Sequence, residues 1–152
     1  MRRATVLVLL FAASCGSSDA GRSADDTATL RIRTDGGIRS LDVQVADTTQ
    51  ERADGVMGRE TLSPYDGMAF VWTEPVHGSF WMKDTLIPLS VAFWDQQGRI
   101  VSIMDMEPCR QDPCPTYGPD TPFVGAVEVA KGGLERRGVA VGDTVDLGAG
   151  EA

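Results

Sequence analysis

Short strand-like runs separated by turn signals dominate most of the sequence, and they constrain the fold more than any other feature. Residues 30–34 and 41–45 alternate between apolar and polar side chains on either side of an Asp-Gly-Gly turn, which predicts a β-hairpin. A turn signal at residues 95–98 predicts a second hairpin. Further apolar runs predict strands at residues 68–72, 79–82, 91–94, 100–103, 123–129 and 144–147.

Two stretches favour short helices. Thr48 and Glu51 form a capping-box pattern that predicts a helix ending at Gly58. Residues 133–137 predict a single helical turn closed by Gly138. Seven or eight strands with one or two short helices predict a mostly β (α+β) fold, either a small β-barrel-like domain or a strongly curved sheet. The length of 152 residues suits one domain, which we place at residues 30–148.

The N-terminus predicts export. Arg2 and Arg3 precede the apolar run 4–13, which is too short to span a bilayer as a helix. Residues 12–15, Ala-Ala-Ser-Cys, resemble a bacterial lipobox, so we expect residues 1–14 to be a lipoprotein signal peptide and Cys15 to be lipidated. The alternative is an ordinary secreted protein that is cut at a similar position and in which this cysteine has no role.

The segment after the cleavage site is expected to be a flexible tether. Residues 15–29 are polar and small, and they offer little apolar surface to bury. We therefore expect an extracytoplasmic domain on the periplasmic or cell-surface side, lipid-anchored to the cell membrane through Cys15.

The charge of the chain excludes two classes of partner. There are 22 acidic and 14 basic residues, which give a net charge of −8. Cleavage before Cys15 would remove two basic residues and no acidic one, which takes the net charge to −10. Because phosphate binding needs a basic surface, we expect no nucleic-acid partner. A polybasic attachment to anionic lipid is excluded for the same reason.

Two cysteines remain beside Cys15. Cys109 and Cys114 lie close together in a proline-rich segment, and an oxidising compartment favours a structural disulfide between them. Closing so short a loop is expected to contribute about 2 kcal/mol. A metal-binding or redox-active pair is the alternative, although a redox pair usually has two intervening residues and a zinc site needs two further ligands.

Short blocks in the middle of the chain carry a family resemblance. The matching residues are Arg52, residues 55–59, 67–70, 80–85 and 87–89, Phe93, Gly98, Glu107, Pro108, Tyr117, Glu128, Gly138, Gly142 and Asp143. Over about residues 41–145 the chain resembles the bacterial and archaeal domain of unknown function 192, DUF192. The resemblance implies a compact, mostly β, barrel-like domain that is often exported or lipid-anchored, and it implies no activity.

The chain departs from the family pattern at two positions. Asp84 stands where the family usually has Asn after the lysine of its aromatic block, and Ser90 stands where it usually has Asp after Ile-Pro-Leu. A role that needs an amide donor at position 84 is therefore not expected in this chain.

Lys83 is the most suggestive candidate for ligand binding. The chain has twelve Arg and only two Lys, and this Lys lies in an aromatic segment where strand alternation places it on the same face as Trp81. The alternative is that Lys83 pairs with Asp84 or Glu128 at a rim. A binding module for a small polar or anionic ligand would use residues able to hold a charge or to stack, namely Arg59, Trp81, Lys83, Asp84, Glu107 and Tyr117.

Three classes of function remain open from the sequence. The favoured one is binding, either of a small ligand or of an envelope protein, with no cofactor or metal. The second is a hydrolase of envelope polymer that uses two carboxylates at a defined separation, drawn from Asp66, Asp84, Glu107 and Glu128. The third is a structural or assembly protein without a pocket, which predicts an exposed apolar patch on one sheet face.

Overall fold

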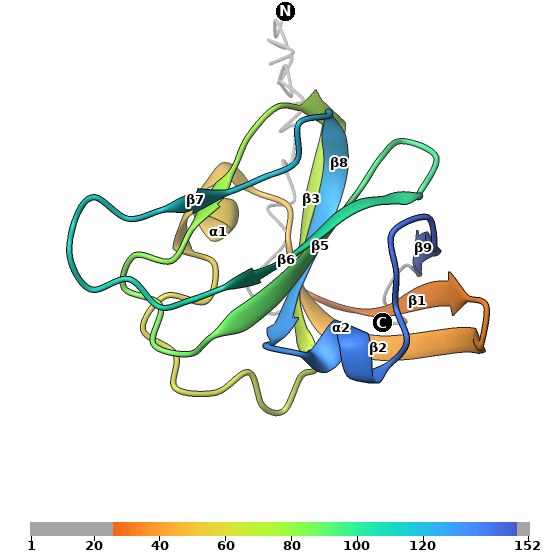
Figure 1. The fold of residues 1–152 in the computed structure, drawn as a ribbon, viewed down its shortest axis with the longest axis horizontal. Coiled ribbons are helices and arrows are strands. Elements are labelled where there is room, and N and C mark those ends of the chain that lie inside the picture. The colour runs from red at the N-terminus through yellow and green to blue at the C-terminus, as the bar shows by residue number, and fades with distance from the viewer. Residues whose placement is uncertain (1–25, 149–152) are drawn as a thin grey trace, which may run out of the picture.

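A computed structural model describes residues 26–148, which form one large and one small β-sheet with two short helices (Figure 1). In chain order the elements are β1 (Thr27–Thr34), β2 (Gly37–Ala46), α1 (Thr49–Asp54), β3 (Gly67–Val76), β4 (Phe80–Trp81), β5 (Leu89–Trp94), β6 (Ile100–Met106), β7 (Thr116–Tyr117), β8 (Phe123–Ala130), α2 (Gly133–Arg136) and β9 (Thr144–Leu147).

The large sheet has seven strands in the order β6-β5-β8-β3-β2-β1-β9. Every neighbouring pair is antiparallel except β2 and β3, which run parallel. The edge strands approach each other at an isolated bridge between Arg99 and Thr144, and the sheet is not closed into a barrel. The predicted mostly β fold is confirmed, and of its two forms the structure adopts the curved sheet. Strands β4 and β7 form the separate two-stranded sheet.

Both predicted hairpins are present. Strands β1 and β2 are joined at a tight turn, where the Thr34 hydroxyl donates to the carbonyl of Gly37 at 2.9 Å. Strands β5 and β6 are joined by the second turn, where the Asp95 carboxylate accepts from the N–H groups of Gln97 and Arg99, both at 2.9 Å. Such side-chain to backbone bonds are the reason that Asp favours turns.

The first helix begins as predicted and ends earlier. The capping box of Thr48 and Glu51 is present, but α1 ends at Asp54 and its C-cap is Gly55 instead of Gly58. The Gly55 N–H donates to the Glu51 carbonyl at 2.8 Å while its φ of 47° turns the chain out of the helix, a conformation that glycine adopts without a steric penalty.

The folded part also starts earlier than expected. Strand β1 begins at Thr27, so the last residues of the predicted tether belong to the sheet. Residues 1–25, which include the predicted signal peptide, Cys15 and most of that tether, lie outside the described residues. Among residues 26–148, no helix combines the length and the apolar character needed to cross a bilayer.

Two separate cores pack against the sheet. The aliphatic core contains the buried residues Ala28, Leu30, Ile32, Leu41, Val43, Val45, Ala69, Ala92, Trp94, Ile100, Val127, Val129, Leu134 and Val139. The aromatic core contains the buried residues Ala46, Val56, Leu62, Met68, Phe70, Met82, Leu89, Val91, Phe93, Met106, Phe123 and Ala126, with Trp72 and Phe80 partly buried against them. Successive side chains of a strand point to opposite faces. The middle strands β3, β5 and β8 therefore contribute to both cores.

Candidate ligand-binding site

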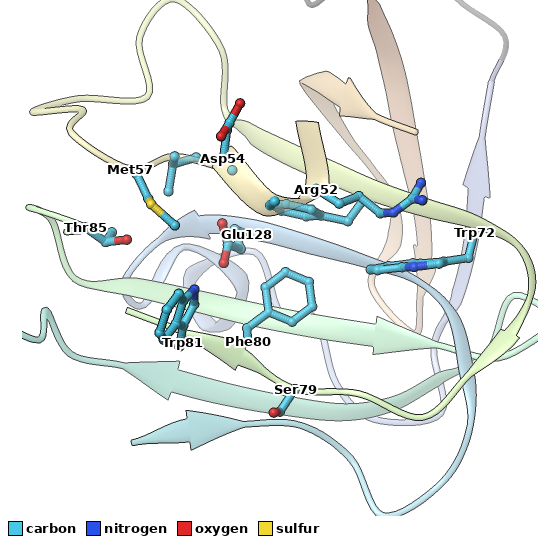
Figure 2. A pocket seen from close by; sticks show the side chains of 13 residues that line it. Arg52, Asp54, Met57, Trp72, Ser79, Phe80, Trp81, Thr85 and Glu128 are labelled. Atoms are coloured by element: carbon cyan, nitrogen blue, oxygen red, sulfur yellow. The ribbon is translucent and has the colours of Figure 1, made fainter. Parts of the chain in front are cut away.

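A cavity of about 150 Å³ opens at one end of the aromatic core, between α1 and strand β4 (Figure 2). Most of its wall is apolar or aromatic. The lining residues are Arg52, Ala53, Asp54, Gly55, Val56, Met57, Phe70, Trp72, Ser79, Phe80, Trp81, Thr85 and Glu128. Small-molecule sites in proteins have this character, namely apolar walls with a few polar groups.

Glu128 is the unusual member of this wall. Its side chain is only 4% exposed, and in the sheet it lies between two buried apolar residues, Met68 of β3 and Val91 of β5. Within the described part of the chain no hydrogen bond or ion pair involves its carboxyl group. Figure 2 shows this carboxyl in the middle of the labelled lining residues. Burial raises the pKa of Glu128 from 4.5 to about 8, so the free carboxyl is mostly protonated at neutral pH.

A close approach between β3 and β8 fixes the position of the Glu128 backbone relative to β3. Gly67 lies so close to β8 that a Cβ at this position would come within 2.1 Å of the Glu128 carbonyl oxygen. A larger residue there would push the two strands apart. The glycine therefore holds the backbone that carries the carboxyl against its neighbour.

The wall around α1 is held by the loop that follows β4. The Gly58 N–H donates to the Asp84 carbonyl at 2.9 Å, and the Thr85 N–H donates to the Met82 carbonyl at 3.2 Å. Thr85 is 5% exposed, and Figure 2 shows its hydroxyl on the side of the cavity. Asp84 has a φ of 57°, in the left-handed region where Asn and Asp are enriched among non-glycine residues. This backbone conformation is one that Asp tolerates, as Asn does.

Arg52 is the cationic side chain of the lining, and it is engaged elsewhere. Its guanidinium donates to the carbonyl of Asp47 and, at 2.9 Å, to the carbonyl of Val71. It also lies over the Trp72 ring, 5.2 Å from the ring centroid. Figure 2 shows the guanidinium turned toward Trp72 and away from Glu128. The buried carboxyl therefore has no counterion from this arginine.

Two of the residues predicted to bind a ligand lie beside each other at the edge of the cavity. Trp81 lines it and is 49% exposed, while Lys83 stands 5.6 Å from the Trp81 ring centroid. Met82 between them is buried, so the predicted alternation is confirmed. Lys83 pairs with Asp112 at 2.9 Å, and not with Asp84 or Glu128 as the alternative predicted. The hydrogen bond to Asp112 raises the pKa of Lys83.

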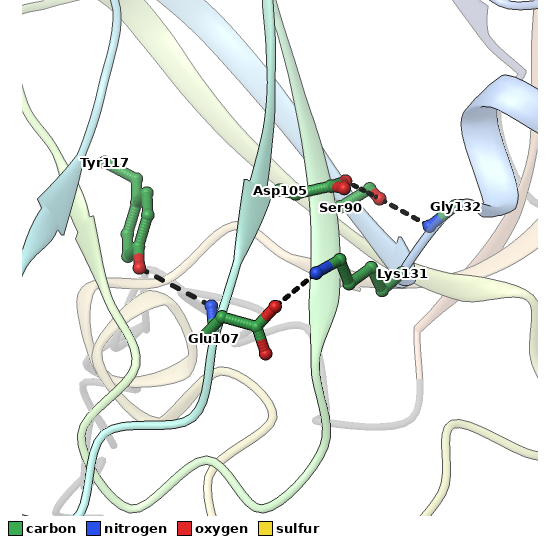
Figure 3. A network of polar contacts seen from close by, with 6 residues as sticks. All are labelled: Ser90, Asp105, Glu107, Tyr117, Lys131 and Gly132. Atoms are coloured by element: carbon green, nitrogen blue, oxygen red, sulfur yellow. Dashed lines mark hydrogen bonds and ion pairs between the residues drawn. The ribbon is translucent and has the colours of Figure 1, made fainter.

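Glu107 and Tyr117 belong to a polar network on another part of the surface (Figure 3). Glu107 forms an ion pair with Lys131, and its N–H lies 3.5 Å from the Tyr117 hydroxyl oxygen that accepts it. In the same region the Ser90 hydroxyl donates to Asp105 at 2.6 Å and accepts from the Gly132 N–H at 2.9 Å. The serine that replaces the family's Asp thus links β5 to β6 and to the start of α2.

The six predicted residues do not line one cavity. Trp81 alone lines the cavity of Glu128, whereas Glu107 and Tyr117 line a shallow surface groove beside the disulfide. Arg59 donates to the Gln44 side chain. Arg59 and Lys83, which were predicted to hold one anion together, have different partners here, Gln44 and Asp112, and neither lines this cavity.

Of the four predicted carboxylates, only Glu128 lines the cavity. Asp66 pairs with Arg137 at 2.7 Å, Glu107 pairs with Lys131, and neither lines the cavity of Glu128. Asp54 does line it, but its carboxylate accepts from the Gln50 side chain at 2.8 Å, and Figure 2 shows it pointing outward.

Residues 26–148 hold no group of three His, Cys, Asp or Glu side chains suited to a metal ion. The predicted disulfide is confirmed between Cys109 and Cys114, with 5.7 Å between their Cα atoms.

Of the large exposed apolar residues, Ile38, Trp81, Leu86 and Val141, only Ile38 lies in the large sheet. The described residues therefore show no apolar patch across one of its faces.

Sequence reasoning named Glu128 only as one of several carboxylates. A signal for its position was present, because it is the single charged residue of the otherwise apolar strand Phe123–Ala130. A charged residue in an apolar strand either lies at an exposed edge of the sheet or is buried at a special position, such as a binding site. Its strand lies between two others, which could not be read from local sequence.

The fold and the cavity define a mostly β domain with a ring-sized pocket whose wall is mostly apolar. Comparison with family models identifies it further: DUF192, described as an uncharacterized ACR family, matches residues 30–147, and the chain belongs to this family.

Solved structures share the fold. A putative transcription regulator from Sinorhizobium meliloti is similar with a TM-score of 0.73 and 27% identity, over 84% of this chain and 98% of that one. A protein of unknown function from Novosphingobium aromaticivorans is similar with a TM-score of 0.72 and 26% identity, over 79% of this chain and 84% of that one. A comparison with curated proteins finds no match.

Proposed function

We propose that this protein binds one small polar molecule in the cavity beneath Trp81 and that the carboxyl of Glu128 is the polar anchor. The observation that carries the proposal is a nearly fully buried carboxyl without a partner on the wall of an aromatic cavity. Because the Glu128 carboxyl lines the cavity and no side chain or backbone group of the described residues binds it, it is free to hydrogen-bond to a molecule that enters. Buried polar groups in native proteins are nearly always satisfied, and a ligand would supply the missing partner.

The size of the cavity limits the ligand. A volume of about 150 Å³ is similar to that of an engineered cavity that binds benzene. The ligand, or the part of it that enters, is therefore about the size of one six-membered ring. Phe80 and Trp81 offer flat apolar surfaces to such a group.

The proposal differs from the sequence-based hypothesis in the charge of the ligand. Lys83 and Arg59 do not line the cavity, and its buried charge-bearing group is an acid. An anionic group would have to approach the Glu128 carboxyl without a cation free to receive it. The geometry supports a polar, non-anionic ligand better.

The location of the protein remains part of the proposal. We propose that Cys15 carries a lipid anchor and that the polar segment after it holds the domain outside the cytoplasmic membrane. The disulfide supports an oxidising compartment, where such bonds persist. An envelope protein remains a second candidate partner, for which the half-exposed Trp81 is the supporting feature.

Two other functions have less support. One structural neighbour is described as a putative transcription regulator, but the net charge of −8 opposes direct contact with DNA in this chain. A hydrolase would need a second carboxylate facing Glu128, and none of the other predicted carboxylates lines its cavity.

A thermal-shift panel on the mature, oxidised protein tests the binding function. The panel contains ring-sized neutral, cationic and anionic compounds. A ligand at a hundred times its Kd stabilises by about 2.7 kcal/mol, which raises Tm by several degrees. We expect at least one hit that is lost in Glu128→Leu and kept in Glu107→Gln, whose carboxyl lies outside the cavity. A panel without any shift would overturn the proposal.

A further inference from the structure

The cavity combines a buried acid with an arginine whose guanidinium is bound to other groups. The ionisable side chains that line it are Glu128, Arg52 and Asp54, all from β8 and α1. Arg52 is bound to two carbonyls and to Trp72, and Asp54 is bound to Gln50. Strands β3, β4 and β5 present no ionisable group to Glu128, which lies between Met68 and Val91. An ionised Glu128 therefore needs a cation that the described residues do not supply.

The remaining walls favour a cation too. The faces of aromatic rings attract cations through their quadrupole. This protein already uses that attraction at both ends of the cavity, where Arg52 lies over Trp72 and Lys83 lies near Trp81. Phe80 lies near Trp72, with 6.4 Å between their ring centroids, and Phe70 lies 4.8 Å from Phe80. A cationic group next to Glu128 would thus be surrounded by rings.

The kind of cation follows from what the wall lacks. Calcium takes six to eight oxygen ligands, and magnesium requires an octahedral shell. The cavity offers one carboxyl with the hydroxyls of Ser79 and Thr85, and its other walls are mostly apolar. An organic cation needs only one acidic partner for its charge and uses the apolar walls for its carbon atoms.

We propose that the ligand is a small primary amine, bound as its ammonium ion against the ionised carboxyl of Glu128, with its apolar group on Phe80 and Trp81. This inference rests on the proposed function and names the ligand class for the same cavity.

Binding includes one proton transfer. The free protein carries Glu128 as a neutral acid at pH 7, because burial raises its pKa to about 8. The amine enters as R–NH₃⁺ and keeps its proton, while the O–H bond of Glu128 breaks and that proton passes to the buffer. Each amine bound therefore releases close to one proton at pH 7 and far fewer at pH 9, where the carboxyl is already ionised.

Isothermal titration calorimetry of the mature protein with three probes of matched shape tests the inference. The probes are benzylamine, benzyl alcohol and benzoate, each measured at pH 7 in two buffers of different ionisation enthalpy. We expect benzylamine to bind at least about tenfold more tightly than benzyl alcohol, since hydrogen bonds to charged groups are the stronger ones. Benzoate is not expected to bind. The difference between the two buffers should report the release of nearly one proton.

Variants separate the ligand class from binding itself. Glu128→Gln keeps the shape of the side chain and cannot ionise, so it should lose the preference for benzylamine while benzyl alcohol still binds. Glu107→Gln removes a carboxyl outside the cavity and should change nothing. Benzyl alcohol binding as tightly as benzylamine would overturn the amine inference and leave the binding function standing. Amine binding without proton release would overturn the proton-transfer step and show that Glu128 is already ionised in the free protein. No saturable binding by any of the three probes would overturn both.

Discussion

The two faces of the large sheet are built for different purposes. The aliphatic core is filled mainly by Leu, Ile, Val and Ala side chains, most of which come from β1, β2, β9 and α2 and from one face of β3, β5 and β8. The aromatic core packs Phe rings edge to face, with centroid distances such as 4.9 Å between Phe93 and Phe123, and it ends in a cavity with a buried acid. Strand β8 serves both, because Val127 and Val129 face one core while Glu128 faces the cavity of the other.

If the proposed function holds, the aromatic core is the place where stability is exchanged for binding. A sequence that specifies one fold usually breaks its own packing rules at functional sites. In this chain the aliphatic core follows those rules, and the aromatic core breaks them with one carboxyl and an unfilled volume. A truncation in the aliphatic core should therefore lower stability. Replacement of the Glu128 carboxyl by an apolar side chain should raise stability and abolish the proposed binding.

The largest expected effect comes from the aliphatic core. Leu41 is fully buried, so Leu41→Ala should reduce the free energy of unfolding by about 2–5 kcal/mol, through lost burial and the cavity left behind. The matched control is Ile38→Ala on the same strand, whose side chain is 54% exposed. It should change stability by less than about 0.5 kcal/mol. Urea unfolding gives both values, and equal effects would contradict the assignment of Leu41 to a packed core.

The opposite sign is expected at Glu128. Replacing this unpaired buried acid by an apolar residue of similar size, Glu128→Leu, should raise the free energy of unfolding at pH 7 by about 1–3 kcal/mol while abolishing ligand binding. A loss of stability in this variant would show that the carboxyl has a partner in the folded protein.

Glu128 should also give the wild type an unusual pH dependence. Its pKa is about 8 in the folded state and 4.5 as the ordinary value. Between pH 4.5 and pH 8 the Glu128 carboxyl is ionised in the unfolded chain but still protonated in the folded protein. The free energy of unfolding should therefore fall as pH rises, by up to about 1.4 kcal/mol per pH unit from this group. Unfolding at several pH values should show this contribution as the difference between wild type and Glu128→Gln.

Loss of the disulfide, which lies beside the aromatic core, should have an intermediate effect on stability. Replacing both Cys109 and Cys114 by Ala should lower the free energy of unfolding by about 2 kcal/mol, because the short loop then opens in the unfolded chain. The loop carries Asp112, so the contact of Lys83 with Trp81 should also loosen. Trp fluorescence would follow that change. Reductant should affect the wild type and leave the double variant unchanged.

The smallest effect is expected at Asp84. Since Asn occupies the left-handed region at least as readily as Asp, Asp84→Asn should change stability by only a few tenths of a kcal/mol. Asp84→Val provides the contrast, because a β-branched residue is strained at this φ and should cost at least about 1–2 kcal/mol. Thermal unfolding of the two variants checks the difference, and equal midpoints would rule out a conformational role for position 84.

Local features of the fold could be predicted from sequence, and long-range ones could not. The two hairpins, the capping box of Thr48 and the Cys109–Cys114 bond depend on residues close in the chain. The two-residue strand β7 is too short to give an alternating pattern. Lys83 finds its partner 29 residues away, at Asp112.

The candidate site shows the same limit more strongly. Its residues come from α1, β3, β4 and β8, and which of them converge depends on the parallel pairing of β2 with β3 and on β8 lying between β3 and β5. Sequence reasoning identified Trp81 as a lining residue but grouped it with Glu107 and Tyr117, which lie elsewhere. The buried position of Glu128 follows from its neighbours in the sheet, Met68 and Val91, which are distant in sequence.

For the proposed ligand, helix α1 would control entry to the cavity and exit from it. The helix has six residues, and none of them is buried. Its last three residues and residues 55–57, which follow it, form one wall of the cavity. Segments with few buried contacts open locally at much lower free energy than the whole domain unfolds. Amide protons of residues 52–57 should therefore exchange with solvent faster than those around Leu41, and a bound ligand should slow them. The residence time of the ligand would then be set by the opening of one short helix, while the aliphatic core remains folded throughout.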